Sequence, residues 1–197
     1  MNAHDLLWGM TPAHLPADAP DWVLDVIDAG HPVVVRRAIA VPGHVAVGVR
    51  GRSREQRFAA VMPIAQVQRC VTPEALCEVI SPRDLPALRA LDLLRPLLAQ
   101  EVWGVAGSAG FELASGIEAL HAQSDLDLIL RTPERLDRGD AEDLLAILDA
   151  APCAVDLQLQ TPFGAVALRE WAGGSRRVLL KTTSGAHLVL DPWQAVA

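Results

Sequence analysis

Three aspartates, Asp125, Asp127 and Asp156, have the residue type and spacing that could do chemistry. Polar and apolar residues alternate over 125–131, so a strand there places Asp125 and Asp127 on one face, roughly 6.6 Å apart at about 3.3 Å of rise per residue. The same alternation recurs over 154–160, with Asp156 on the polar face. If the two strands are neighbours, about 4.8 Å apart, the three carboxylates share one surface.

Carboxylates gathered this closely repel one another and raise one another's pKa unless a cation lies among them. Mg²⁺ binds a few carboxylate oxygens and completes its octahedron with water and substrate phosphate. The sequence therefore predicts a magnesium site formed by Asp125, Asp127 and Asp156, acting on a phosphorylated substrate. The alternative is that these aspartates mark strand ends that face water.

A Gly107-Ser108 turn precedes the acidic strand and opens a predicted helix. Gly107 would let backbone N–H groups approach a phosphate at the helix N-terminus, and the Ser108 hydroxyl could donate as well. For Gly107 the simpler explanation is a turn that needs no side chain. Lys181 is a further candidate for a phosphate contact, and the competing interpretation is an ordinary lysine at the end of a strand.

Arginines are concentrated in the first third of the chain, with six between positions 36 and 57. Arg52 and Arg54 lie in a predicted loop, where guanidinium groups could meet a polyphosphate or an acidic surface. A solvated loop explains them equally well.

The N-terminal half predicts a short helix and a small sheet. A helix over 22–29 would be capped by Asp21, and apolar runs predict strands over 33–35, 45–49 and 57–62. Helical residues follow from Thr72 to Leu98, interrupted by prolines. We place the domain boundary inside this region, which divides the chain into an α+β domain, 1–90, and a catalytic domain, 91–197.

The C-terminal half alternates between strand and helix. This order predicts a mixed α/β sheet with helices packed on it, preceded by a smaller β-rich domain. The expected elements are strand 102–106, helix 109–120, strand 125–131, a helix from about 138 to 150 capped by Asp140, strand 154–160, strand 165–168 and a hairpin of 178–180 with 187–190.

Bulk properties exclude several classes of protein. The net charge of -7 argues against general nucleic-acid binding, which needs a basic face. No apolar run reaches the roughly 18 residues of a membrane span. The first residues lack the basic and then apolar order of a secretory signal, so we expect a cytoplasmic protein that binds no membrane.

The order Gly-Ser, Asp-x-Asp, then a single carboxylate on a later strand resembles the nucleotidyltransferase superfold typified by DNA polymerase beta. The gap from Ser108 to Asp125 is wider than in many members, which implies a longer helix or an extra loop around 116–121.

A narrower resemblance covers most of the chain. Its motifs are similar to those of the malonate decarboxylase holo-acyl-carrier-protein synthase family, the phosphoribosyl-dephospho-CoA transferases. The motifs are His4 to Trp8, Gly51 to Arg57, Trp103 to Ser108, Ser124 to Leu128, Val155 through Trp171, Leu180 to Thr182 and Asp191 to Trp193.

The resemblance implies a reaction. The donor would be 2'-(5''-triphosphoribosyl)-3'-dephospho-CoA, and the acceptor a serine of the apo acyl-carrier subunit of malonate decarboxylase, with pyrophosphate as leaving group. Asp125 and Asp127 would hold Mg²⁺ against the triphosphate, and Asp156 would complete the metal site or take the serine proton. Two alternatives stay open: another magnesium-dependent nucleotidyltransferase, such as an adenylyl transferase, and a non-catalytic nucleotide-binding relative.

Overall fold

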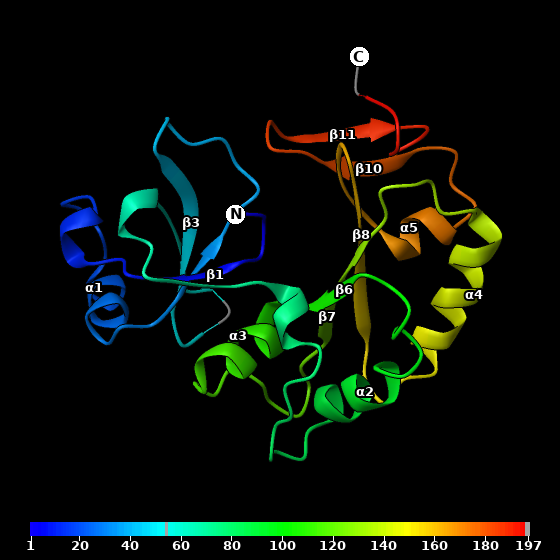
Figure 1. Ribbon diagram of the computed structural model, residues 1–197, viewed down its shortest axis with the longest axis horizontal. Helices are drawn as coiled ribbons and strands as arrows, with labels where there is room; N and C mark the ends of the chain where they lie inside the picture. Colours follow the sequence, from blue (N-terminus) through cyan, green and yellow to red (C-terminus); the bar gives the residue numbers. More distant parts are fainter. Residues whose placement is uncertain (54, 196–197) are drawn as a thin grey trace.

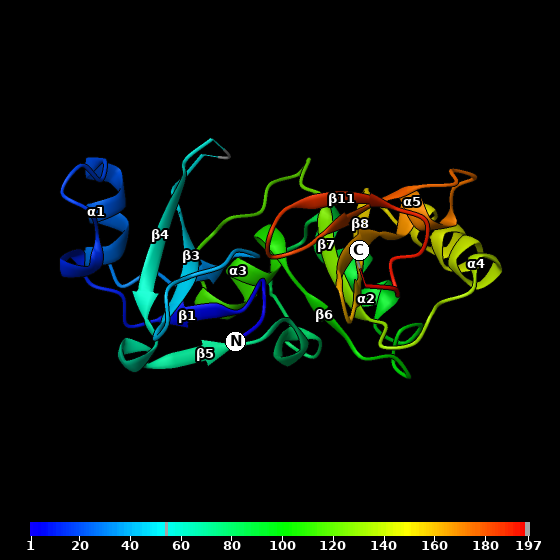
Figure 2. The ribbon, with the colours of Figure 1, turned by 90° about the horizontal axis from the view of Figure 1, so that it is seen from above.

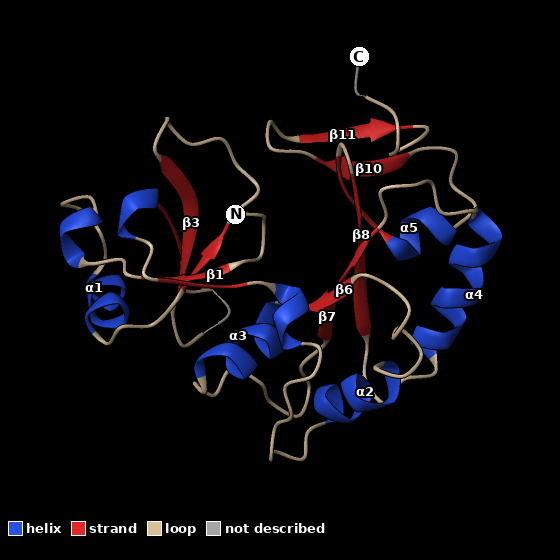
Figure 3. Cartoon of the chain, in the orientation of Figure 1, coloured by secondary structure: helices blue, strands red, loops and turns tan. Residues whose placement is uncertain are grey.

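The computed structural model describes residues 1–53 and 55–195, and this part of the chain forms two β-sheets and five α-helices (Figures 1 and 3). The mixed α/β class expected from the sequence is confirmed. The sheet formed by the N-terminal strands and the sheet formed by the C-terminal strands lie side by side, with helix α3 (Gly107–Ser115) between them in both ribbon views (Figures 1 and 2).

The first sheet is antiparallel throughout, with the strand order β4-β3-β2-β1-β5. One face packs with helix α1 (Asp21–Asp28) around a core that includes Leu7, Val23, Val33, Val47 and Met62. The opposite face therefore remains available to the second sheet. The strands are β1 (Leu6–Trp8), β2 (Val33–Val35), β3 (His44–Arg50), β4 (Arg57–Pro63) and β5 (Arg69–Val71).

The second sheet has the order β11-β10-β9-β8-β7-β6. Strands β7 and β8 run parallel and are joined by helix α4 (Arg138–Asp149), while the other neighbouring strands are antiparallel. The strands are β6 (Trp103–Val105), β7 (Leu126–Arg131), β8 (Val155–Thr161), β9 (Gly164–Ala167), β10 (Val178–Lys181) and β11 (Ala186–Val189).

Alternation along β7 and β8 sorts their side chains between two environments. Leu126, Leu128, Val155, Leu157 and Leu159 are buried in the larger core. Helices α2 (Pro86–Leu94), α4 and α5 (Leu168–Ala172) cover this apolar face, on the side away from the first sheet (Figure 1). The polar face of β7 and β8 consequently turns toward the N-terminal sheet.

The helix prediction for residues 72–98 is wrong in part. The helix expected from 72 to 98 is a 3₁₀ helix, Pro73–Leu76, followed by non-helical residues 77–85 and then α2. The prolines at 82 and 86 explain the gap, because proline lacks an N–H and disfavours helical geometry at the preceding residue. Thr72 does cap the first turn, since its Oγ1 accepts from the Ala75 N–H at 3.4 Å.

The expected N-caps of two other helices are also wrong. Pro20 occupies the N-cap of α1 and Asp21 is its first residue, because Pro20 fixes the extended backbone that precedes the helix. Asp137, rather than Asp140, caps α4, and its Oδ1 accepts from the Gly139 N–H at 2.8 Å. Asp140 instead lies in the first turn, where a negative charge favours the helix dipole.

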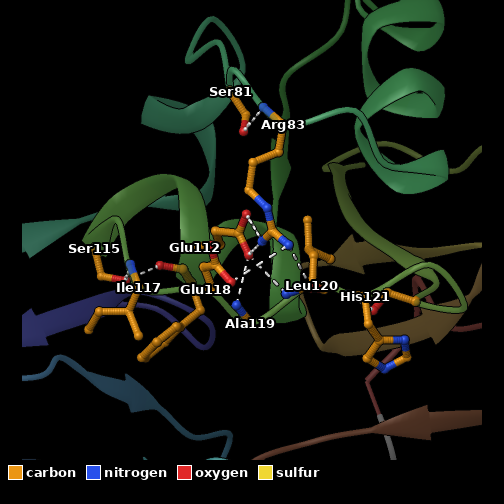
Figure 4. Close-up of polar contacts among 11 residues, drawn as sticks. Ser81, Arg83, Glu112, Ser115, Ile117, Glu118, Ala119, Leu120 and His121 are labelled. Atoms are coloured by element: carbon orange, nitrogen blue, oxygen red, sulfur yellow. Dashed lines mark hydrogen bonds and ion pairs between the residues drawn. The ribbon is translucent and has the colours of Figure 1, made fainter.

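The helix expected over 109–120 ends earlier, at Ser115, because Gly116 adopts a left-handed conformation with φ of +74°. The following loop is tied back to the helix by Glu112 (Figure 4). The Glu112 carboxylate accepts from the backbone N–H groups of Ala119 and Leu120 at 2.7 and 2.9 Å and from Arg83 at 2.7 Å. The extra loop that the sequence allowed between Ser108 and Asp125 is present.

The sequence boundary at residues 90 and 91 falls inside α2, all of whose buried residues pack in the core of the second sheet. The 3₁₀ helix before it also packs against that sheet, because a Cβ at Gly104 of β6 would lie 2.4 Å from the carbonyl carbon of Pro73. None of the helices in residues 1–53 and 55–195 is long and apolar enough to cross a membrane.

Candidate functional site

Two of the three aspartates lie opposite each other on neighbouring strands. Asp127 of β7 and Asp156 of β8 are paired in register, so their side chains share the polar face of the sheet. Both line a cavity of about 300 Å³ that Lys181 and Gln158 also line. Asp156 is exposed, whereas Asp127 is partly buried. The structure therefore brings Asp127, Asp156 and Lys181 together.

Asp125 lies at the entrance of the same strand. It precedes β7 by one residue and is partly exposed, and it is not among the residues that line the cavity of Asp127 and Asp156. Asp125 acts electrostatically on the loop before β8. The pKa of the Cys153 thiol in that loop is raised by burial and, to a smaller extent, by the negative charge of Asp125. The loop that delivers Asp125 is held by Ser124, whose Oγ accepts from the His121 N–H at 3.0 Å.

Gly107 and Asp127 are in direct contact. A Cβ on Gly107 would fall 1.8 Å from the Asp127 Oδ2, so no larger residue fits beside this carboxylate. Gly107 also has a φ of +58°, which favours glycine. The carboxylate is thus held at the N-terminal end of α3, where the helix dipole favours negative charge.

Asp125, Asp127 and Asp156 are the magnesium ligands expected from the sequence. In the described residues, no group of three or more His, Cys, Asp or Glu side chains could by itself hold a metal ion. Mg²⁺ commonly binds through one or two carboxylates and takes its other ligands from water and substrate phosphates. A pair of aspartates beside a phosphate-binding turn matches this second mode.

The N-terminal sheet contributes an arginine to the turn. Arg50, the last residue of β3, donates from Nη2 to the Ser108 Oγ at 2.6 Å, and its guanidinium lies 5.3 Å from the centre of the Phe111 ring. Burial and the charge of Arg57 lower the pKa of Arg50, and Asp127 opposes this shift. The sequence identified the arginine-rich region but did not single out Arg50, although alternation along β3 places it on the same face as Gly48.

A larger cavity, of about 450 Å³, lies between the two sheets. The first sheet lines it with apolar side chains and with Arg36, Arg50 and Arg57, and the second domain lines it from Val105 to Gly107 and with Gly110 and Phe111. Since Gly107 lines this cavity and contacts Asp127, the cavity adjoins the acidic face. A further hydrogen bond joins the N-terminal and C-terminal parts of the chain: Arg37 Nη2 donates to Gln160 Oε1 at 2.8 Å.

His4 lies at the junction of these surfaces and was not a candidate from the sequence. It lines the 450 Å³ cavity and a neighbouring one that Lys181 and Gln158 also line. Burial, followed by the charges of Arg37, Arg131 and Lys181, lowers the pKa of His4 to about 4. Its φ of +78° is unusual for a residue other than glycine. His4 is therefore a neutral imidazole at neutral pH within a basic surround.

Of the predicted arginine contacts, Arg52 lines a different cavity from Asp127 and Asp156. Arg52 is exposed and lines a second cavity of about 450 Å³, on the side of Arg50 and Phe111 toward helix α1. The prediction for Arg54 falls outside the described residues. A carboxylate pair, a helix N-terminus and several guanidinium groups along neighbouring cavities are suited to an enzyme that acts on a phosphorylated substrate.

Comparison with known proteins narrows this class. The family model "Phosphoribosyl-dephospho-CoA transferase MdcG C-terminal domain" matches residues 75–192, and the corresponding N-terminal domain model matches residues 2–73. Together they cover both sheets. The chain therefore belongs to the phosphoribosyl-dephospho-CoA transferase family, and it is a transferase.

Relatives named phosphoribosyl-dephospho-CoA transferase align along nearly their whole length. The protein from Pseudomonas fluorescens strain Pf-5 is 65% identical over 96% of this chain and 92% of its own. The protein from Pseudomonas aeruginosa strain PAO1 is 58% identical over 97% and 93%. The Azotobacter vinelandii protein is 55% identical over 98% and 95%. A search of solved structures gave no significant match.

Proposed function

We propose that the protein transfers the phosphoribosyl-dephospho-CoA group from 2'-(5''-triphosphoribosyl)-3'-dephospho-CoA to a serine of the apo acyl-carrier subunit of malonate decarboxylase, in the cytoplasm. The serine oxygen forms a bond to the α-phosphorus, the bond from that phosphorus to the oxygen bridging to the β-phosphate breaks, and pyrophosphate leaves. The carrier gains its prosthetic group through a phosphodiester. The family match supports the transferred group, and the site supports the chemistry.

One observation carries the assignment of the site: the Asp127 carboxylate contacts Gly107 at the start of α3 and is in register with Asp156 on the next strand. Anion-binding N–H groups and carboxylates are thereby placed within one small region. A phosphoryl-transfer site needs both, because the phosphate must be held and its charge neutralised. We also propose that the second sheet belongs to the nucleotidyltransferase superfold, on the basis of the order β6, Gly107-Ser108, α3, β7 and β8.

We assign the metal site to Asp125 and Asp127, with Asp156 beside them. A magnesium ion held there would neutralise charge on the triphosphate and on the oxygens that attack and leave. Asp125 lies one residue before β7 and is partly exposed, and Gly107 fixes the position of the Asp127 carboxylate. This pair is the protein's contribution, and the triphosphate and water supply the remaining oxygens.

We assign Asp156 as the general base that accepts the proton of the acceptor serine. Its side chain is exposed, so a serine on a macromolecular acceptor can reach it, whereas Asp127 is packed against the helix. Lys181 lines the same cavity and is assigned to a phosphate oxygen of the donor. Ser108, held by Arg50, contributes a further contact to the phosphates, and Arg52 contacts the donor farther from the reacting atoms.

The test is to weigh the carrier subunit after incubation with the protein, the triphosphoribosyl donor and Mg²⁺. The proposed function predicts a mass increase equal to phosphoribosyl-dephospho-CoA and stoichiometric pyrophosphate. A parallel incubation with ATP in place of the donor separates the alternatives, since a gain of AMP would identify an adenylyl transferase. No mass gain with either donor, despite intact fold and metal, would contradict the proposal.

A further inference from the structure

Small residues of the N-terminal sheet form one wall of the 450 Å³ cavity between the sheets, and we call this wall the floor of the cavity. Gly48 of β3 and Ala59 of β4 are directly paired across the sheet, and both side chains belong to the face that lines the cavity. Leu6 and Val34 extend this floor onto β1 and β2, since Leu6 pairs with Val34 and Val34 with Gly48. Four neighbouring strands thus contribute to an apolar surface, and the two smallest residues, Gly48 and Ala59, lie on its two adjacent strands β3 and β4.

The protein's own packing does not require glycine at position 48. A Cβ there would meet the Arg36 side chain at 3.5 and 3.6 Å and the Val34 carbonyl oxygen at 3.9 Å, which are ordinary contacts. The backbone of Gly48 is not in the left-handed region either. Glycine weakens a strand interior, and where it occurs it often marks the close approach of a ligand. The absence of a side chain at Gly48 therefore leaves space in the cavity beside Arg36, which a bound molecule can use.

The rim of this cavity is basic. Arg50 and Arg57 are paired across β3 and β4, and Arg36 also lines the cavity, with its aliphatic Cγ and Cδ beside Gly48. Guanidinium groups bind phosphate through charge-assisted hydrogen bonds, so this rim favours an anionic ligand. The cavity ends at Gly107, next to the Asp127 carboxylate. An apolar floor with a basic rim suits a planar base that carries phosphates.

The space continues beyond Arg50. Arg50 and Phe111 line both this cavity and the second one of about 450 Å³, which reaches Trp22 and His31. A donor bound in the first cavity can therefore extend in two directions, toward the aspartates and toward helix α1. A dephospho-CoA derivative has this shape, because its adenosine carries the reacting triphosphoribosyl group on one side and the pantetheine arm on the other.

We propose that the cavity between the sheets binds the adenine nucleotide of the donor, with the purine ring on Gly48 and Ala59 and its phosphates on Arg36, Arg50 and Arg57. The identity of the donor rests on the proposed function, but the cavity, its floor and its rim do not. The N-terminal sheet then recognises the donor, and the C-terminal sheet carries out the transfer.

The test fills the floor without harming the strand. Gly48→Val adds a β-branched side chain that strands favour, at a position where its Cβ meets no backbone atom closer than 3.9 Å. The matched control is Gly174→Val, because a Cβ at Gly174 meets nothing within 4 Å. Calorimetry measures binding of dephospho-CoA, ADP, pantetheine and inorganic triphosphate to the full-length protein, and thermal melting checks the fold.

The inference predicts that Gly48→Val weakens dephospho-CoA and ADP by about ten-fold or more, while inorganic triphosphate changes by less than about two-fold. Melting temperature should equal or exceed that of the wild type, and the Gly174 variant should bind like the wild type. Wild-type affinity of Gly48→Val for dephospho-CoA would overturn the inference. Pantetheine binding that Gly48→Val abolishes would also overturn it, because the arm would then occupy this floor.

The two proposals fail separately. If the wild type does not bind dephospho-CoA or ADP but still modifies the carrier, the adenine site is wrong and the transfer stands. If Gly48→Val loses ADP binding but the wild type adds no mass to the carrier, the adenine site stands and the assigned donor or acceptor is wrong.

Discussion

The Asp127 carboxylate lies against Gly107, the first residue of α3, so closely that a Cβ on Gly107 would be 1.8 Å from its Oδ2. This contact links the acidic strand to the end of a helix that attracts anions. A phosphate bound at the same helix end would be repelled by the Asp127 carboxylate unless a cation lay between the two negative groups. The contact therefore explains why glycine occupies position 107.

Gly107→Ala should abolish most activity. The substitution forces either Asp127 or the helix to move, and a displacement of about 1 Å in a reacting group can cost about 100-fold in rate. The matched control is Gly116→Ala, which also replaces a left-handed glycine, φ +74°, but meets nothing within 4 Å. Alanine in the left-handed region costs about 1–2 kcal/mol in both variants, and Gly107→Ala should lose more stability because of the added clash. Only Gly107→Ala should lose turnover. Equal turnover in the two variants would contradict the role of the contact.

Arg50→Ala should weaken donor binding more than it slows transfer. The change removes a charged hydrogen bond to Ser108 and a guanidinium beside the cavity, worth about 1.5–3 kcal/mol or roughly 10- to 100-fold in KM. Arg89→Ala is the control, because Arg89 is exposed on α2 and forms an ion pair with the exposed Asp84. Steady-state kinetics with varied donor separates KM from kcat. An unchanged KM for Arg50→Ala would refute its contact with donor.

Glu112→Gln should destabilise the fold at neutral pH by about 3 kcal/mol, because it breaks a buried carboxylate–guanidinium pair with Arg83. Burial by itself raises the pKa of Glu112, but the N–H groups of Ala119 and Leu120 and the Arg83 side chain outweigh burial and lower it. A carboxyl with a lowered pKa contributes stability above its unfolded pKa of about 4.5, and this stability is lost as pH falls through the folded value. Urea unfolding at several pH values measures the effect.

Glu118→Gln provides the comparison for that measurement. Glu118 is 79% exposed and lies 3.9 Å from the same arginine, so its loss should cost less than about 1 kcal/mol. The difference between the two variants in free energy of unfolding should become smaller as the pH falls. A constant gap down to pH 3 would show that Glu112 acts through packing rather than charge.

His4→Asn should flatten the dependence of stability on pH between about 6.5 and 4. The pKa of His4 falls from 6.5 to about 4 on folding, so in this interval the unfolded chain binds a proton that the folded chain does not. Wild-type stability therefore decreases as pH falls through this window. Asparagine tolerates the φ of +78°, which limits backbone strain. The control is His121→Asn, at an exposed position, which should keep the wild-type dependence of stability on pH. The same wild-type dependence in His4→Asn would contradict the burial of the His4 imidazole.

The strands of the second sheet could be predicted because their pattern is local. Alternation around Asp127 and Asp156 requires a polar and an apolar face, and the structure pairs these two residues in register. The early end of α3 could not be read in the same way. Its stop depends on Gly116 and on Glu112 capturing N–H groups seven and eight residues ahead, which is a tertiary effect.

The contribution of the first sheet to the site was harder to predict. Strands β1 and β5 have three residues each, too few for a periodic signal. The contact from Arg50 to Ser108 spans 58 positions and depends on how the two domains pack. The sequence indicated that arginines gather near residue 50, but choosing among them required knowing which face of β3 meets the second sheet.

The most direct measurement of the central claim is single-turnover transfer to the carrier by Asp125→Asn and Asp127→Asn, with melting and dephospho-CoA binding recorded for each variant. The account predicts that both variants fold and bind dephospho-CoA but leave the carrier mass unchanged in saturating Mg²⁺. Transfer that stays magnesium-dependent at the wild-type rate in both variants would contradict it.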